Sequence, residues 1–225
     1  MSDLPTPADP AQPAERENPA KRVLPRNPVA AAIVAAAFTV LLYLVELADR
    51  VIPADLEQGG INARLLGGLD GIVWAPLLHD GWSHLLSNTI PVLVFAFLAM
   101  APGIGRWALV TAMIWLLGGL GVWLTGPAGM VTIGASGLAF GWLAFLLVRG
   151  IFTRGFGQLI VAAVLLFLWG GMLWGLLPGN PGVSWQGHLF GALAGLLAAW
   201  TLARADRRRA RAVVPGSGTQ QPGTE

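Results

Sequence analysis

Two residues of this chain could together form a nucleophile and its base: Ser136 and His188. Ser136 lies in the run Gly134-Ala135-Ser136-Gly137, which opens an apolar stretch, and His188 opens another such stretch about fifty residues later. Polar groups inside membrane helices are rare, usually face the bundle interior and usually mark a functional site. A serine hydroxyl becomes a nucleophile when a base within hydrogen-bond reach takes its proton. The pair therefore indicates acyl-transfer chemistry, provided that the two side chains meet.

The composition is typical of a polytopic membrane protein. The chain has 225 residues, of which 55% are apolar and 12% are charged, and its mean hydropathy is +0.64. Each of six apolar runs is close to the ~20 residues that a helix needs to cross a bilayer core. They cover residues 29–45, 85–101, 107–124, 133–148, 159–177 and 188–203. We therefore predict an all-α bundle of six transmembrane helices. Cysteine is absent, which excludes disulfides and thiol chemistry.

The chain divides into three segments. Residues 1–26 are rich in Pro, Ala and charged residues, so we expect a disordered cytoplasmic tail there. The membrane domain is expected over residues 27–204. Residues 205–225 are first basic and then of low complexity, and we expect a second cytoplasmic tail there. The first external connection, from Asp49 to Asp80, is long and contains an apolar run around Trp74. We interpret this run as a segment lying in the outer membrane interface with Trp74 as its anchor; an ordinary solvated loop is the alternative.

The basic residues predict the orientation of the bundle. Of the 14 Lys and Arg residues, only Arg50 and Arg64 fall on the side opposite the termini. The positive-inside rule then places both termini in the cytoplasm of a multi-pass cell-membrane protein. Lys21 is the only lysine, and the chain is rich in Arg, Ala and Gly. This composition is typical of a GC-rich bacterial genome, so we expect the membrane to be a bacterial plasma membrane. The pI is near 9.9, but the basic residues are distributed as this topology requires. We therefore expect contact with the lipid bilayer and no nucleic-acid binding.

With this topology, the second, fourth and sixth helices all begin at the external face. His84 and Asn88 lie in the first turns of the second helix, Ser136 in the first turn of the fourth, and His188 in that of the sixth. At 1.5 Å per residue, these four side chains lie at similar shallow depths. We expect Ser136 and His188 to form a dyad, since no Asp or Glu lies in these three helices. His84 and Asn88 are candidate donors to the oxyanion, together with the Ser136 backbone N–H. This chemistry requires no cofactor and no metal.

Glycines indicate how the two helices of the dyad could approach each other. Gly187, Gly191 and Gly195 form a small-residue stripe on the sixth helix, where a second backbone can come close. The fourth helix begins with small residues of its own: Gly134, Gly137 and Gly141. If the two stripes meet, His188 can reach Ser136; helix packing alone is the alternative role for the glycines.

Three motifs resemble those of the rhomboid family of intramembrane serine proteases, over about residues 60–203. Gly134-Ala135-Ser136-Gly137 is similar to the G-x-S-G nucleophile motif, and His84 to Asn88 is similar to the H-x-x-x-N motif of the second helix. Gly187-His188, followed by Gly191 and Gly195, resembles the sixth-helix histidine with its glycines. The resemblance implies a serine endopeptidase (a hydrolase) with a cavity that opens outward. It also implies that the fifth helix and a cap over 178–185 gate the site, and that His79 is structural.

The resemblance further implies a substrate class: single-span membrane proteins, cut in their transmembrane segments near their external ends. The chain departs from the family pattern at two places. Phe140 stands where many members have a tyrosine that packs on the histidine, so the ring can stack but cannot donate a hydrogen bond. A Trp-Arg pair of the first loop is missing, and Arg64 replaces it only loosely. Neither change removes a group that performs chemistry.

Two other functions are compatible with such a chain. A catalytically inactive rhomboid-like protein that binds membrane clients is the first alternative, but such proteins typically lose the serine or the histidine. A transporter or channel is the second; it predicts polar groups that continue to the inner half of the helices, and here these halves are almost wholly apolar. The natural substrate and the oligomeric state stay open at this level.

Overall fold

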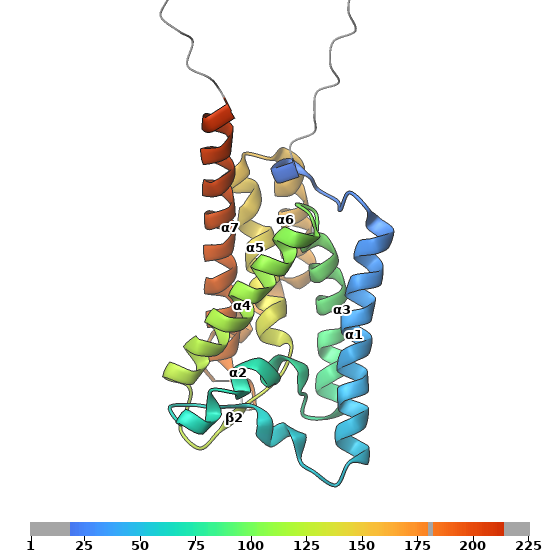
Figure 1. Cartoon of the computed structure of the whole chain (residues 1–225), viewed down its shortest axis with the longest axis vertical. Coiled ribbons are helices and arrows are strands. Elements are labelled where there is room, and N and C mark those ends of the chain that lie inside the picture. Colours follow the sequence, from blue (N-terminus) through green and yellow to red (C-terminus); the bar gives the residue numbers. More distant parts are fainter. Residues whose placement is uncertain (1–18, 180–181, 214–225) are drawn as a thin grey trace, which may run out of the picture.

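The computed structural model describes residues 19–179 and 182–213. Within these residues, six helices are long and apolar enough to cross a membrane, as the sequence predicts. They are α1 (Pro28–Val51), α3 (Gly81–Ala99), α4 (Ile104–Thr125), α5 (Ser136–Thr153), α6 (Phe156–Trp169) with its 3-10 continuation η5 (Gly170–Leu176), and α7 (Trp185–Val213). The described N-terminal segment and the C-terminal end of α7 lie at the same end of the bundle (Figure 1).

Helix α5 is the central element of the bundle. More than half of its apolar window, 56%, is buried in the protein, against 11% for the span formed by α6 and η5. α5 contacts α3, α4, α6 and α7, and its Trp142, Leu138 and Leu143 are among the most buried large side chains. The helix that begins with Ser136 is thus held on several sides, whereas α6 presents most of its surface outward.

Several helix ends lie beyond the apolar runs that predict them. α1 begins at Pro28, behind an Asn27 cap whose Oδ1 accepts the Ala30 N–H, and continues to Val51. Its last turns contain Glu46 and Arg50, which pair one turn apart. α3 begins at Gly81, which places His84 inside its first turn. Charged or polar residues at the ends are missed by a hydropathy pattern because a helix end in the interface tolerates them.

Close backbone contact joins α5 to α7. A Cβ atom at Gly191 would overlap the carbonyl oxygen of Gly137, and one at Gly195 would overlap that of Gly141. The stripes on the fourth and sixth spans therefore meet, as the sequence predicts. Because the two backbones touch without intervening side chains, α5 and α7 have little freedom to shift relative to each other.

The long first connection is folded and fastened to its neighbours. It contains the short helices η2 (Leu56–Gly59), η3 (Leu66–Gly68), α2 (Gly71–Trp74) and η4 (Ala75–Leu77). The indole N–H of Trp115 donates to the Ile72 carbonyl at 2.9 Å, and that of Trp123 donates to the Leu65 carbonyl at 2.8 Å. Strand β1 (Ile61–Asn62) pairs with β2 (Val131–Thr132), which shortly precedes Ser136. The loop therefore braces the segment that carries the nucleophile. Trp74 is 53% exposed, and its depth in the interface stays a prediction.

Helical structure extends into both segments that the sequence analysis treats as tails. Residues 1–18 and 214–225 lie outside the described residues, but Pro19–Lys21 form a 3-10 helix, η1, in the segment expected to be disordered. Arg149 and Gln158 hold this segment by donating to the backbone carbonyls of Ala20 and Arg22. At the other end, α7 continues to Val213, well beyond residue 204. Residues 19–21 are thus helical within a segment expected to be disordered, and the two buried side chains bind the chain at Ala20 and Arg22.

Candidate active site

Ser136 is the first residue of α5, and a tight backbone turn places it there. Gly134 has φ +117°, a conformation that residues with a Cβ rarely adopt. A Cβ at this position would also lie 2.9 Å from His84 Nε2, so a side chain would block the approach of the His84 ring. Two backbone donors hold the turn: the Gly134 N–H donates to the Ala75 carbonyl at 2.8 Å, and the Ala135 N–H to His79 Nε2 at 3.3 Å.

The structure brings Ser136 and His188 together. His188 Nε2 lies 2.9 Å from Ser136 Oγ, and His188 Nδ1 lies 2.9 Å from the carbonyl oxygen of Gly175. A carbonyl oxygen can only accept, so Nδ1 of the neutral ring is the nitrogen that carries the proton. Nε2 is then free to accept the serine O–H. This tautomer is the one that a general base for Ser136 requires.

The imidazole of His188 is confined on its faces as well as at its nitrogens. The Phe140 ring stacks on it with centroids 4.1 Å apart and an interplanar angle of 11°. A Cβ at Gly175 would lie 3.0 Å from His188 Nδ1 and 3.1 Å from the Phe140 ring, so the backbone of η5 packs closely against both rings. His188 is 8% exposed. The stacking predicted for the phenyl ring is therefore present, and the Gly175 carbonyl fixes the ring edge.

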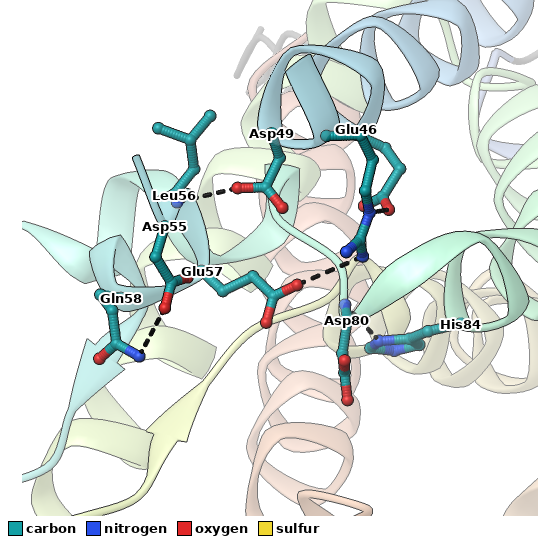
Figure 2. Close-up of polar contacts among 9 residues, drawn as sticks. Glu46, Asp49, Asp55, Leu56, Glu57, Gln58, Asp80 and His84 are labelled. Atoms are coloured by element: carbon teal, nitrogen blue, oxygen red, sulfur yellow. Dashed lines mark hydrogen bonds and ion pairs between the residues drawn. The ribbon is translucent and has the colours of Figure 1, made fainter. Parts of the chain in front are cut away.

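His84 faces the same turn from α3. Its Nδ1 accepts the backbone N–H of Asp80 at 3.3 Å (Figure 2), so the proton of the neutral ring lies on Nε2. The ring edge that carries Cε1 and Nε2 packs against Gly134, two residues before Ser136. Donation from the His84 N–H to an oxyanion formed at Ser136 stays a prediction.

His79 supports the turn from outside the spans. Its ring packs edge-on against His84, with centroids 5.1 Å apart, and its Nε2 accepts the Ala135 N–H. Burial, with a smaller contribution from the neighbouring His84, lowers the pKa of His79 to about 4. A neutral His79 is what this hydrogen bond requires, because a protonated Nε2 could not accept.

Asn88 is nearly buried, at 5% exposure. Its Nδ2 donates to the His84 carbonyl at 3.0 Å, one helical turn earlier. One of its two amide N–H groups is therefore occupied within α3. Its predicted donation to the oxyanion stays a prediction, which requires the second N–H or a rearrangement when substrate binds.

The first turn of α5 contributes backbone donors. The first N–H groups of a helix have no carbonyl one turn earlier to bind, and they carry the positive end of the helix dipole. The donors before Ser136 are already used, since Gly134 and Ala135 bind Ala75 and His79. The N–H groups from Ser136 onward remain as the backbone donors of this first turn, and the predicted role of the Ser136 N–H as a donor to the oxyanion stays a prediction.

A small cavity, with a volume of about 50 Å³, opens beside Ser136. Its walls come from the long first connection, α4, the turn before α5 and the start of α7, and most of them are apolar or glycine. They include Ala75, Gly118, Val122, Ile133, Ser136 and Gly187.

Several acidic residues surround the C-terminal end of α1, near His84. Arg50 Nε donates to Glu46 Oε1 at 2.9 Å, and its Nη2 lies 3.5 Å from Glu57 Oε1 (Figure 2). Burial, and then the nearby Asp80 and Asp49, raise the pKa of Glu57. None of these carboxylates hydrogen-bonds His188 in the described residues, so the cluster ties α1 to the loop without extending the dyad.

Sequence reasoning missed two groups of the site. The first is the Gly175 carbonyl, which accepts the hydrogen bond from His188 Nδ1. An Asp or Glu side chain is the acceptor that a sequence can reveal at this position, and a backbone carbonyl is used here in its place. Ser184 caps α7, since its Oγ accepts the Gly187 N–H at 3.2 Å and its carbonyl accepts the His188 N–H. A serine three residues before the Gly187-His188 pair is a recognisable helix-cap signal, but a backbone carbonyl has none.

Comparison with known proteins bears on this arrangement. The profile of the Rhomboid domain matches residues 66–205. The chain belongs to the rhomboid family. The matched range includes the second half of the long first connection and all three motifs on α3, α5 and α7. Membership thus agrees with the six-span bundle and identifies the chain as a multi-pass membrane protein.

Several relatives extend the match. An uncharacterized protein of Mycobacterium tuberculosis is 49% identical over 184 residues, which cover 78% of this chain and 76% of the relative. An uncharacterized protein of Mycobacterium leprae is 46% identical over 193 residues, with 82% and 76% covered. A Bacillus subtilis protein named as a candidate rhomboid protease is 29% identical over 135 residues, with 59% and 67% covered.

Proposed function

We propose that this rhomboid-family chain is an intramembrane serine endopeptidase with Ser136 as nucleophile and His188 as base. One observation carries the proposal: Ser136 Oγ lies 2.9 Å from His188 Nε2 while the opposite nitrogen is bound to the Gly175 carbonyl. A serine and a histidine in contact could be incidental. A histidine held in the tautomer and orientation that accept the serine proton fits a catalytic role far better.

The reaction begins with the scissile carbonyl beside Ser136. Oγ attacks the carbonyl carbon and its proton passes to His188 Nε2, which makes the ring an imidazolium that still donates to Gly175 through Nδ1. Collapse of the tetrahedral intermediate breaks the C–N bond, and His188 returns the proton to the leaving amine. Water then attacks the acyl-serine, again with its proton taken by His188, and releases the new carboxylate and Ser136.

The oxyanion of each intermediate needs donors that are in place before it forms. The Ser136 N–H and the His84 Nε2–H are two such donors, and the free N–H of Asn88 is a third. A donor of this kind typically contributes about 10²–10³ in turnover. The fixed α5 helix start and the Asp80-bound His84 ring provide this preorganisation, since neither has to reorient when charge develops.

The proposed substrates are single-span membrane proteins, cut near their external ends. The cavity beside Ser136 is lined mostly by apolar groups, and the described end of the bundle that carries Lys21 and the arginines of α7 is taken as cytoplasmic by the positive-inside rule. Ser136 then lies near the external face of a bacterial plasma membrane, where water can reach it.

Proteolysis of reporters tests the proposal. The full chain is reconstituted in liposomes with single-span reporters whose outer transmembrane ends contain small or helix-breaking residues, and products are mapped by mass spectrometry. We expect cleavage within the outer third of the reporter segment and none with Ser136→Ala. Binding of reporters without cleavage by a correctly folded wild-type chain would instead favour an inactive, client-binding rhomboid homologue.

A further inference from the structure

The last turns of α7 carry a row of exposed basic side chains that the proposed proteolysis does not use. We propose that this arginine stripe, formed by Arg204, Arg208 and Arg211 next to Trp200, binds the headgroup of an anionic phospholipid. All four side chains lie at the exposed surface of the helix. The inference concerns the opposite end of the bundle from Ser136 and does not depend on the proposed protease activity.

Two contacts fix the level of the stripe relative to the bundle. Arg106, near the start of α4, pairs with Asp206 through two hydrogen bonds, one of 2.9 Å, and Arg207 donates to the Phe152 carbonyl near the end of α5 at 3.2 Å. Residues 206 and 207 are therefore level with the ends of the neighbouring spans. The rest of α7 projects past them, as the free red end of the helix shows (Figure 1).

The stripe occupies one face of the helix. At about 100° per residue, positions 200, 204, 208 and 211 fall within an arc of roughly 80°. Asp206 lies on the opposite face, where it is paired with Arg106. The only described acid at this end of the bundle is thus turned away, so the three guanidinium groups of the stripe present uncompensated positive charge outward.

Trp200, which lies next to the arginine stripe, favours a lipid headgroup over a soluble anion as the ligand. The Arg204 guanidinium lies 5.2 Å from the centroid of the Trp200 ring, and Trp200 is 41% exposed. Tryptophan is enriched at the boundary between acyl chains and headgroups, which is the depth that the helix ends indicate here. Arginine presents a planar fork of donors that matches phosphate oxygens. An acyl chain can therefore pack beside Trp200 while its phosphate contacts the arginines above.

Native mass spectrometry of the full chain tests this site. Purified protein in detergent is given equal amounts of phosphatidylglycerol and phosphatidylcholine, and the lipids retained are counted. We expect wild type to prefer phosphatidylglycerol. Arg204→Gln/Arg208→Gln/Arg211→Gln should weaken phosphatidylglycerol binding by on the order of 100-fold, since each basic residue near an anionic surface contributes about 5-fold.

A matched variant separates the stripe from bulk charge. Arg26→Gln/Arg154→Gln/Arg209→Gln removes three exposed charges from the same end of the bundle but outside the stripe, and it should keep the preference of wild type. Thermal unfolding of both variants checks that they fold. Equal losses in both variants, or no lipid preference in wild type, would overturn the site. Displacement of the lipid by inorganic phosphate at equal concentration would show a site for soluble anions and would also overturn it.

Discussion

Replacing Gly191 by alanine should damage activity far more than the added methyl group suggests. An ideal Cβ at this position would lie 3.0 Å from the Gly137 carbonyl carbon and closer still to its oxygen. Carbon atoms in favourable contact are about 3.5–4.0 Å apart, so α5 and α7 must separate by about 1 Å. These are the helices that carry Ser136 and His188.

The same displacement would act directly on the dyad. Ser136 Oγ and His188 Nε2 are 2.9 Å apart, and an increase of about 1 Å takes them beyond normal hydrogen-bond distance. A misplacement of this size can cost about 100-fold in rate. We therefore expect Gly191→Ala to lower kcat by roughly 100-fold, and Gly191→Leu to lower it further, while the protein stays in the membrane as a helical bundle.

The assay compares initial cleavage rates of a transmembrane reporter in liposomes, with helical content and thermal unfolding measured on the same samples. Gly105→Ala is the matched control, because no atom lies within 4 Å of a Cβ at that helical glycine, and its rate should equal that of wild type. If Gly191→Ala cleaved as fast as Gly105→Ala, the close contact of α5 and α7 would not position the dyad and the reasoning would fail.

Other predictions follow from the same site. Ser136→Ala and His188→Ala should each reduce cleavage to background, and the double variant should be no slower than either, because the two groups act as a unit. His84→Ala and Asn88→Ala should retain slow cleavage, reduced by about 10²–10³-fold, since the Ser136 N–H remains as an oxyanion donor; rates at background for either would show that its role exceeds donation. The pKa of His79 is about 4 in the folded chain and 6.5 in the unfolded chain. Between these two pH values, the unfolded chain binds a proton on His79 that the folded chain does not. Stability should thus fall by about 3 kcal/mol as pH decreases through this window, and His79→Gln should flatten this part of a thermal-unfolding series. An unchanged pH slope in His79→Gln would contradict the assignment.

The depth-matched layer of polar residues was predictable because it follows from simple geometry. Chain direction alternates from span to span, and the helical rise fixes how far a residue lies from the end of its span. His84, Ser136 and His188 therefore come to the same end of the bundle whatever the details of side-chain packing. The contact between the glycines of α5 and α7 was predictable for a similar reason, since small residues repeated every fourth position leave a flat face.

The acceptor of His188 Nδ1 was not predictable in this way. Every residue has a backbone carbonyl, so the use of the one at Gly175 depends on where η5 departs from α-helical geometry, and no side chain marks that point. The contact of the N-terminal segment with α5 and α6 was not predictable for a related reason, because its acceptors are also backbone carbonyls. In the sequence, Arg149 is one of the basic residues from which the positive-inside rule predicts the orientation of the bundle. In the folded chain it is buried and binds the carbonyls of Ala20 and Arg22.

Labelling with a fluorophosphonate probe tests most directly whether His188 activates Ser136. The wild-type chain, Ser136→Ala, His188→Ala and His84→Ala are each treated in detergent, and the modified residue is identified by mass spectrometry of peptides. The result expected from a Ser–His dyad is that the phosphonate is found on Ser136 in wild type and, more slowly, in His84→Ala, and that it is absent from the other two variants. Labelling of Ser136 in His188→Ala at the wild-type rate, or none in a folded wild-type chain, would contradict it.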